Sequence, residues 1–232
     1  MDERLMALKL GLPLQFIVKE QELSRILGNL ASLIDNRTIL KGGTAINFAY
    51  LHKRFSEDLD FDCFGCKHPV KSGFEGPFKL HNTWRYHFPY DLDGARDNIR
   101  VEITEKKGWD AVKKYVKKQP LEFFHGSIIA NIPIYTLKFL AASKIMLLSQ
   151  RQEGKDFFDA YWALRECVPK KEINAVEELE NVKDIVSNAI ISIEKASPKQ
   201  LALTNNYIPR SNRPKSWKLL LDELKEMLKE LL

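Results

Sequence analysis

The chain carries its most telling stretch between Ile39 and Cys63, which reads ILKGGTAINFAYLHKRFSEDLDFDC. The end of this stretch, DLDFD, alternates acidic and apolar residues, and alternation at period two is typical of a β-strand. On a strand, Asp58, Asp60 and Asp62 share one face. Like charges so close repel each other, so a fold keeps such a row only where a cation or solvent neutralises it. Because Mg²⁺ prefers carboxylate and phosphate oxygens, the stretch predicts a metal-and-phosphate site.

The glycine pair upstream of the carboxylates favours a phosphate-binding turn. Glycine tolerates positive φ and close backbone approach, so Gly42 and Gly43 let backbone N–H groups reach a phosphate at the start of a helix expected over 45–53. Thr44 stands at the expected N-cap of that helix, where its hydroxyl can bind the same phosphate. A tight turn followed by an acidic strand end in solvent is the alternative. The glycines and carboxylates together, joined across one helix, favour the functional interpretation.

A second acidic strand is predicted over 98–104. Its apolar residues alternate with polar ones, which places Arg100 and Glu102 together on the polar face. An acidic residue there suits the role of a third metal ligand. We assign that role to Glu102, with Glu57 and Glu105 as alternatives.

The chain as a whole reads as a mixed α/β half followed by a helical half. We therefore expect an α+β fold, with a mixed β-sheet and flanking helices in a first domain, 1–130, and helices in a second domain, 131–232. The expected helices are 19–34, 45–53, 136–151, 155–165, 172–196 and 216–232; the expected strands are 37–41, 59–64, 83–90 and 98–104; irregular segments are expected over 65–83 and 204–215.

Composition is that of an ordinary globular protein. The 232 residues are 44% hydrophobic and 29% charged, with a net charge of +5. No apolar run reaches the length of a membrane span, and the first residues, MDERLMALKL, do not resemble a secretory signal. The 3 cysteines are few and odd in number. They predict no disulfide framework and favour a reducing cytoplasm.

Two further patterns suggest binding sites. The segment 106–118 contains a basic run around Trp109 and Tyr115, and lysines four apart indicate neighbouring rows of a helix that could follow an RNA backbone; a solvated surface is the alternative. The basic run consists of Lys106, Lys107, Lys113, Lys114, Lys117 and Lys118.

The group Cys63, Cys66 and His68 has zinc-ligand residue types but no fourth ligand at suitable spacing.

The block KGGTAINFAYLHKRFSEDLDFD resembles the signature of AbiEii-type nucleotidyltransferases. These are toxins of type IV toxin–antitoxin systems within the DNA polymerase β-like nucleotidyltransferase superfamily. The later block KFLAASKIMLLSQRQEGKDFFDAYWAL is similar to that family's lysine-bearing helix and its R/K-D-x-x-D-x-Y-x-x-L helix, and NIRVEIT resembles the strand that supplies a third carboxylate. Thr44 stands where much of the superfamily has Ser, and the spacing from Thr44 to Asp58 exceeds the superfamily's shorter form.

The resemblance implies a nucleotidyltransferase-like fold in which the helical domain completes the active-site cleft. It implies that Asp58, Asp60 and Glu102 bind Mg²⁺, and that Glu102 can also bind or deprotonate the attacking hydroxyl. Asp62 shares the acidic face, and a solvated strand residue is its simpler interpretation. The nucleoside triphosphate is expected to contact Gly42, Gly43, Thr44, Arg54, Ser56 and Lys144.

Five of the implied residues have a structural alternative. Arg54 and Ser56 can be a loop cap and an ion pair with a neighbouring carboxylate. Lys144, implied to neutralise phosphate charge, can be an ordinary lysine at a helix edge. Asp156 and Asp159, one of which is implied to complete the pocket, can instead complement the dipole of their helix.

These expectations lead to one function and two rivals. The first hypothesis is a Mg²⁺-dependent nucleotidyltransferase that transfers NMP from an NTP to RNA, with tRNA the favoured acceptor, as a toxin held in check by an antitoxin. The second is a nucleotidyltransferase that modifies a protein hydroxyl, as in AMPylation. The third is a catalytically inactive RNA-binding module on the same fold.

Overall fold

The chain divides into two compact units. The computed structural model describes residues 2–65, 74–92, 95–169 and 182–232. The first unit is Met1–Tyr135 and the second is Thr136–Leu232. The division therefore falls a few residues after the expected end of the first domain at residue 130.

The first unit is built on a seven-stranded mixed sheet with the order β3-β4-β5-β2-β1-β7-β6. Two strand pairs, β2 with β5 and β1 with β7, are parallel, and the remaining neighbours are antiparallel. The strands are β1 (Thr38–Lys41), β2 (Asp58–Cys63), β3 (Glu75–Leu80), β4 (Thr83–Leu92), β5 (Ala95–Glu105), β6 (Val116–Glu122) and β7 (Ile128–Tyr135).

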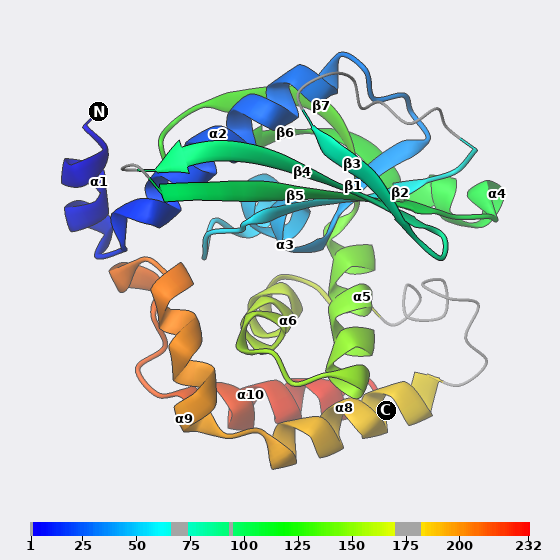
Figure 1. Cartoon of the computed structure of the whole chain (residues 1–232). Helices are drawn as coiled ribbons and strands as arrows, with labels where there is room; N and C mark the ends of the chain where they lie inside the picture. The colour runs from blue at the N-terminus through cyan, green and yellow to red at the C-terminus, as the bar shows by residue number, and fades with distance from the viewer. Residues whose placement is uncertain (1, 66–73, 93–94, 170–181) are drawn as a thin grey trace. The chain divides into compact units, whose positions relative to one another are not determined.

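Helices lie on both faces of this sheet. The long helix α2 (Leu14–Ala31) lies across one face and contacts β2, β4, β5 and β7, whereas α3 (Gly42–Ile46) lies on the other, as Figure 1 shows. The buried side of α2 carries Leu23, Ile26 and Leu27 at helical spacing, which is the pattern of an amphipathic helix. Shorter helical elements complete the unit: α1 (Glu3–Leu10), the π-helical turn η1 (Asn47–Leu51), α4 (Trp109–Val112) and the 3₁₀ turn η2 (Lys113–Tyr115).

Alternation along β2 and β5 separates the core from the polar face of the sheet. Leu59 and Phe61 of β2 are buried, and so are Val101 and Ile103 of β5 opposite them. Because successive side chains of a strand point to opposite faces, Asp58, Asp60 and Glu102 meet on the other face. The apolar residues thereby fix the register that brings the carboxylates together.

Four sequence expectations for the first unit are wrong. The segment 65–83 contains β3, and β6 and β7 were not expected as strands, because their alternation is weak and interrupted by proline. The helix expected over 45–53 instead begins at Gly42 and ends as the π-helical turn η1. The basic run is not one helix: Lys113 lies in η2, whereas Lys117 and Lys118 lie on β6, so its lysines do not form rows of a helix.

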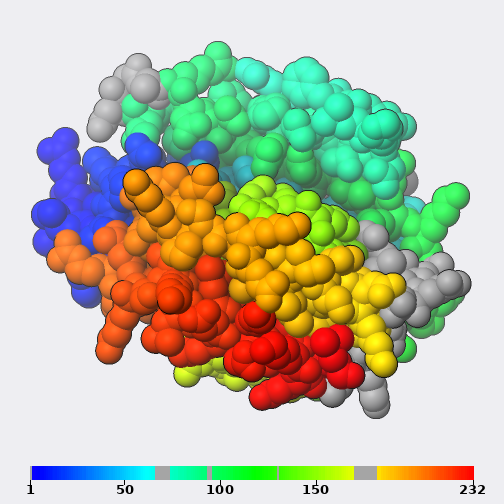
Figure 2. Space-filling model, turned by 90° about the horizontal axis from the view of Figure 1, so that it is seen from below, coloured from blue at the N-terminus to red at the C-terminus, as the bar shows by residue number. Residues whose placement is uncertain are grey.

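The second unit is helical, as expected. In the space-filling view of Figure 2, α8 (yellow to orange) and α10 (red) form much of its visible surface. Its core is a cluster of buried side chains that includes Leu148, Phe157, Phe158, Val186 and Leu224. The elements are α5 (Leu137–Gln150), α6 (Gly154–Glu166), α8 (Val182–Lys195), α9 (Pro198–Leu201), α10 (Trp217–Lys229) and the 3₁₀ turns η3 (Ala202–Tyr207) and η4 (Arg210–Asn212), which lie largely in the segment expected to be irregular.

The structure describes two of the cysteines. Cys63 is disulfide-bonded and Cys167 carries a free thiol. Cys66 and His68, the other members of the suggested zinc group, lie outside the described residues. Within the described ranges, no helix has the length and apolar character needed to cross a membrane.

Candidate active site

Three neighbouring strands bring charged residues to one face of the sheet. Lys41 of β1 pairs with Asp60 of β2, and Asp60 pairs in turn with Glu102 of β5. Two residues earlier on β2 and β5, Asp58 pairs with Arg100. Residues paired across strands point to the same face, so the predicted carboxylates form one cluster.

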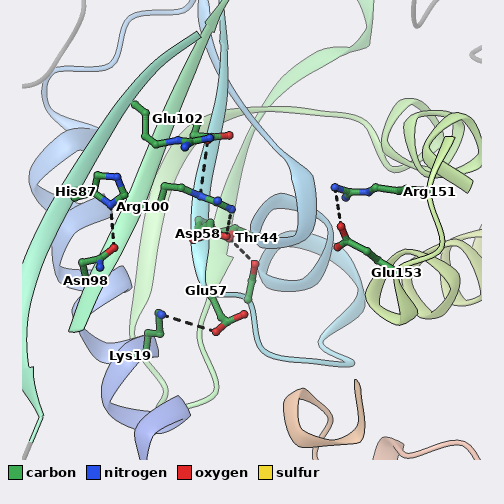
Figure 3. Close-up of polar contacts among 12 residues, drawn as sticks. Lys19, Thr44, Glu57, Asp58, His87, Asn98, Arg100, Glu102, Arg151 and Glu153 are labelled. Atoms are coloured by element: carbon green, nitrogen blue, oxygen red, sulfur yellow. Dashed lines mark hydrogen bonds and ion pairs between the residues drawn. The ribbon is translucent and has the colours of Figure 1, made fainter. Parts of the chain in front are cut away.

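Two arginines neutralise part of this cluster. The Nη2 atom of Arg100 lies 2.6 Å from Oδ2 of Asp58, and its Nε atom lies 3.8 Å from Oε1 of Glu102. In Figure 3, Arg100 lies between these two carboxylates. On β4, Arg85 places both Nε and Nη2 2.7 Å from Oε1 of Glu102. All four side chains are partly exposed, so water and solutes can compete for these ion pairs.

Burial and neighbouring charges perturb the electrostatics of Asp60. Burial, followed by the negative charges of Asp58 and Glu102, raises the pKa of Asp60 to about 6, while Lys41 and Arg100 act in the opposite direction. A raised carboxyl pKa of this origin means that the site favours added positive charge.

Asp62 has different partners from Asp58 and Asp60. Its Oδ1 atom lies 2.6 Å from Nζ of Lys41, and its Oδ2 accepts a hydrogen bond of 2.9 Å from the hydroxyl of Tyr135. The side chain is buried rather than solvated. Asp62 therefore ties β2 to β1 and β7, and its geometry favours a structural role.

The glycine pair allows close packing beside Asp60. Gly42 has a φ of +71°, and a Cβ atom there would lie 2.6 Å from Oδ2 of Asp60. A Cβ atom at Gly43 would lie 2.6 Å from Nη2 of Arg54 and 3.0 Å from Oγ of Ser56. Only glycine fits these contacts without displacing a charged or polar neighbour.

Thr44 is not the N-cap of its helix. Lys41 occupies that position, and Thr44 lies inside α3 with its side chain buried. The Thr44 hydroxyl lies 2.9 Å from Oγ of Ser56 and within hydrogen-bond distance of the Asp58 backbone carbonyl. The hydroxyl thus holds the loop before β2 in place, and the helix begins three residues earlier than the sequence suggests.

Arg54 and Ser56 are buried in the same loop. The Nη1 atom of Arg54 donates to the Phe55 carbonyl at 2.6 Å, and its backbone N–H donates to Oδ1 of Asn47 at 3.2 Å. The guanidinium therefore lies against the glycine turn. Whether it contacts a nucleotide stays a prediction.

The predicted residues of the second unit form a buried ion-pair cluster. Nζ of Lys144 lies 2.7 Å from Oδ1 of Asp156 and 2.9 Å from Oδ2 of Asp159, and Nε of Arg151 lies 2.7 Å from Oδ2 of Asp156. Burial raises the pKa of Asp156, but Lys144 and Arg151 outweigh burial and hold it below its ordinary value. Lys144 is thus a buried residue rather than an ordinary lysine at a helix edge, and its charge is matched by two carboxylates.

The donor atoms of the three carboxylates decide whether this cluster suits a metal ion. Asp58, Asp60 and Glu102 offer only oxygen ligands on one face, and the raised pKa of Asp60 favours a cation nearby, which suits Mg²⁺. Among the described residues, however, no three acidic, His or Cys side chains are already arranged around a common point. The ion pairs with Arg85 and Arg100 account for this, because they draw Glu102 and Asp58 toward guanidinium groups.

Glu102 is better placed than its two alternatives. Glu105 pairs with Cys63, an odd number of positions from Asp60, so it points to the opposite face of the sheet, and it accepts a hydrogen bond from Nε1 of Trp84. Glu57 lies 3.8 Å from Nζ of Lys19. No sequence pattern pointed to Arg85, and Arg100 was assigned no role, although the alternation that selected Glu102 places Arg100 on the same face.

A mixed sheet with paired carboxylates beside a glycine turn defines the class of nucleotidyltransferases. A model described as "Nucleotidyl transferase AbiEii toxin, Type IV TA system" matches residues 25–79 and 73–230. The chain belongs to this family of nucleotidyltransferases, which confirms the resemblance seen in its motifs.

Solved structures share the fold at low sequence identity. JHP933 from Helicobacter pylori is 18% identical with a TM-score of 0.61, over 95% of this chain and 93% of that one. MenT4, the nucleotidyltransferase toxin Rv2826c from Mycobacterium tuberculosis H37Rv, is 15% identical with a TM-score of 0.61, over 99% and 90% of the two chains. A comparison with curated proteins found no match. The expected α+β fold is confirmed.

Proposed function

We propose that this chain is a Mg²⁺-dependent enzyme that transfers NMP from an NTP to RNA, with tRNA the favoured acceptor, and releases pyrophosphate. In the proposal it acts in the cytoplasm as a toxin restrained by a separate antitoxin protein, in keeping with its family. One observation supports the chemistry most strongly. Asp60 and Glu102 lie opposite each other, with Asp58 on the same face and the glycine turn packed against Asp60.

Each residue near the cluster has a distinct part in the proposal. When bound, Mg²⁺ supplies charge neutralisation for the triphosphate and activation of the acceptor hydroxyl. Asp58 and Asp60 hold the metal, and Glu102 completes the ligands or accepts the proton of the attacking hydroxyl. Gly42 and Gly43 let Asp60 and Arg54 pack against the backbone of the turn, whose N–H groups bind phosphate oxygens in the proposal.

The remaining predicted residues are proposed to contact the nucleotide. Thr44, Arg54 and Ser56 order the loop that borders the glycine turn, and Arg54 carries the positive charge that a triphosphate attracts. For the second unit we keep the prediction that Lys144 neutralises phosphate charge and that Asp156 or Asp159 serves the reaction. Phosphoryl-transfer sites depend mainly on such positioning and charge neutralisation.

The positive charge of the chain supports an RNA acceptor. The chain has a net charge of +5, and Lys117 and Lys118 lie exposed on the edge strand β6. Exposed lysines bind a phosphate backbone through salt-dependent contacts. Transfer to a protein hydroxyl, and an inactive RNA-binding module, are outcomes of the experiment below.

The experiment supplies each α-³²P-labelled NTP with Mg²⁺ and either bulk tRNA or cell protein. Asp60→Asn removes the central carboxylate charge, and Asp91→Asn, an exposed carboxylate on β4, is the control. Label in RNA that Asp60→Asn abolishes and Asp91→Asn preserves supports the proposal. Label in protein supports the protein-modifying alternative. NTP binding without transfer to either supports the inactive module, and equal labelling by Asp60→Asn contradicts the assigned site.

A further inference from the structure

We propose that Arg100 is a nucleotide-binding residue that exchanges partners: its guanidinium pairs with Asp58 in the metal-free protein and moves to the triphosphate when the metal–nucleotide complex binds. The inference rests on the proposed function and deepens it, because it assigns a second state to a residue of the same site. It depends on three observations about Arg100 and its neighbours.

The first observation is that Arg100 is ion-paired with a carboxylate proposed to hold the metal. Its Nη2 atom lies 2.6 Å from Oδ2 of Asp58, the first carboxylate of the cluster, because the two residues pair directly in the register of β2 and β5. The guanidinium offsets the negative charge of Asp58 and so competes with a divalent cation for that charge. Release of this contact would therefore strengthen cation binding at Asp58.

The second observation is that Arg100 is incompletely bonded in this position. Its Nε atom is buried and has no hydrogen-bond partner among the described residues, with Oε1 of Glu102 3.8 Å away. A buried donor without an acceptor is unfavourable by a substantial fraction of a hydrogen bond. Arg100 thus has donors left for another acceptor, and the planar fork of arginine matches phosphate oxygens well.

The third observation is the contrast with Arg85. Both Nε and Nη2 of Arg85 lie 2.7 Å from one oxygen of Glu102, so two donors of Arg85 hold this carboxylate. The Arg100 side chain has a single close contact and is 40% exposed. Of these two arginines, Arg100 is the one with both the freedom and the unused donors to change partner.

The test separates metal binding from nucleotide use. Mn²⁺, a stand-in with a spectroscopic signal, is titrated into the nucleotide-free protein and followed by electron paramagnetic resonance. Since an exposed ion pair no longer competes, Arg100→Gln should bind Mn²⁺ about three- to fivefold more tightly. With a lost arginine–phosphate contact, its KM for the NTP should rise about tenfold while kcat changes little.

Two variants control for charge and folding. Arg96→Gln removes an arginine from the same face of the same strand, where it pairs with Glu75 at 2.6 Å, and should change neither quantity. Arg100→Lys keeps the charge, so its Mn²⁺ affinity should stay near that of the unchanged protein. Circular dichroism and thermal unfolding establish that each variant folds.

The results that would overturn the partner exchange of Arg100 differ from those that would overturn the proposed function. Unchanged or weaker Mn²⁺ binding by folded Arg100→Gln overturns the exchange, as does a protein that binds no Mn²⁺. Tighter Mn²⁺ binding together with a higher KM supports it. The proposed function fails separately, through absence of label transfer by the unchanged protein, and the Mn²⁺ titration is read without any transfer.

Discussion

Asp60 and Glu102 lie directly opposite each other in the parallel register of β2 and β5, on the face of the sheet away from the apolar side chains. Parallel pairing sets their side chains side by side although the residues are far apart in sequence. Burial and the two neighbouring carboxylates raise the pKa of Asp60, so the pair attracts positive charge. The proposed chemistry depends on this relationship.

The assignment of Glu102 can be tested against its neighbour on the same strand. Glu102→Gln removes a charge beside Asp60 and should lower nucleotidyl transfer by about a hundredfold or more. Glu105→Gln changes a residue on the opposite face and should keep activity within about threefold of the unchanged protein. Initial rates with labelled NTP measure both. A larger loss in Glu105→Gln than in Glu102→Gln contradicts the assignment.

Substitution of Gly42 tests the close packing at Asp60. Gly42→Ala forces a side chain into a backbone with φ of +71° and places Cβ 2.6 Å from Oδ2 of Asp60. The strain should lower the free energy of unfolding by about 1–3 kcal/mol. Displacement of Asp60 should in addition lower the rate of nucleotidyl transfer per folded molecule.

Gly65→Ala controls for backbone strain alone. Gly65 also has a positive φ, +67°, but nothing lies near the position of its Cβ. Denaturant unfolding should therefore show strain in both variants, while transfer should fall only in Gly42→Ala. Equal transfer rates in the two variants count against the packing argument.

The ion-pair cluster of the second unit predicts a specific acid sensitivity. Although burial raises the pKa of Asp156, Lys144 and Arg151 outweigh it and hold this pKa below its ordinary value in the folded protein. The lowered folded-state pKa means that Asp156 stabilises the fold above about pH 4 and that this contribution is lost as the pH falls through the folded-state value. Asp156→Asn should lower the free energy of unfolding at neutral pH by about 3 kcal/mol and flatten its decline in acid.

Asp110→Asn is the matched control for that experiment. Asp110 also has a lowered pKa, from its contact with Lys113, but it is exposed to solvent. Screening by water leaves such a pair with little effect on stability. Urea unfolding between pH 3 and pH 7 should therefore distinguish the two variants, and an identical pH profile would show that the buried cluster does not stabilise the fold.

A buried carboxylate on α2 predicts a purely structural effect. Glu20 is 0% exposed and accepts hydrogen bonds from the Phe124 backbone N–H at 2.8 Å and from Nδ1 of His125 at 3.1 Å. Glu20→Ala leaves these donors unsatisfied and should lower the free energy of unfolding by about 2–4 kcal/mol. Glu22→Ala, on the partly exposed side of the helix, should change it little. Transfer per folded molecule should stay unchanged in both.

The predictable part of the site is the part that follows from local alternation. The period-two pattern of DLDFD and of the strand around Glu102 identified both acidic faces before the register was known, because side-chain direction on a strand is a local property. The glycines were identifiable for the same reason. The family motif extended the prediction to Lys144, Asp156 and Asp159.

The unpredicted part depends on long-range packing. No local pattern reveals that Lys41 binds Asp62, or that Arg85 reaches Glu102 from a different strand, because strand order decides these contacts. The strands β3, β6 and β7 were missed since proline interrupts their alternation, and pairing with a neighbour stabilises them. The start of α3 at Gly42, and hence the position of Thr44, is likewise set by the packing of the turn against Asp60.

The central claim is nucleotidyl transfer. It is tested most directly by following the α- and γ-phosphates of the same NTP. The same NTP is supplied with ³²P at either the α or the γ position, together with Mg²⁺ and tRNA. The account predicts that the α label enters RNA and the γ label appears in pyrophosphate, both abolished by Asp60→Asn and preserved by Asp91→Asn. Transfer of the γ label to RNA, or incorporation of the α label by Asp60→Asn at the unchanged rate, would contradict it.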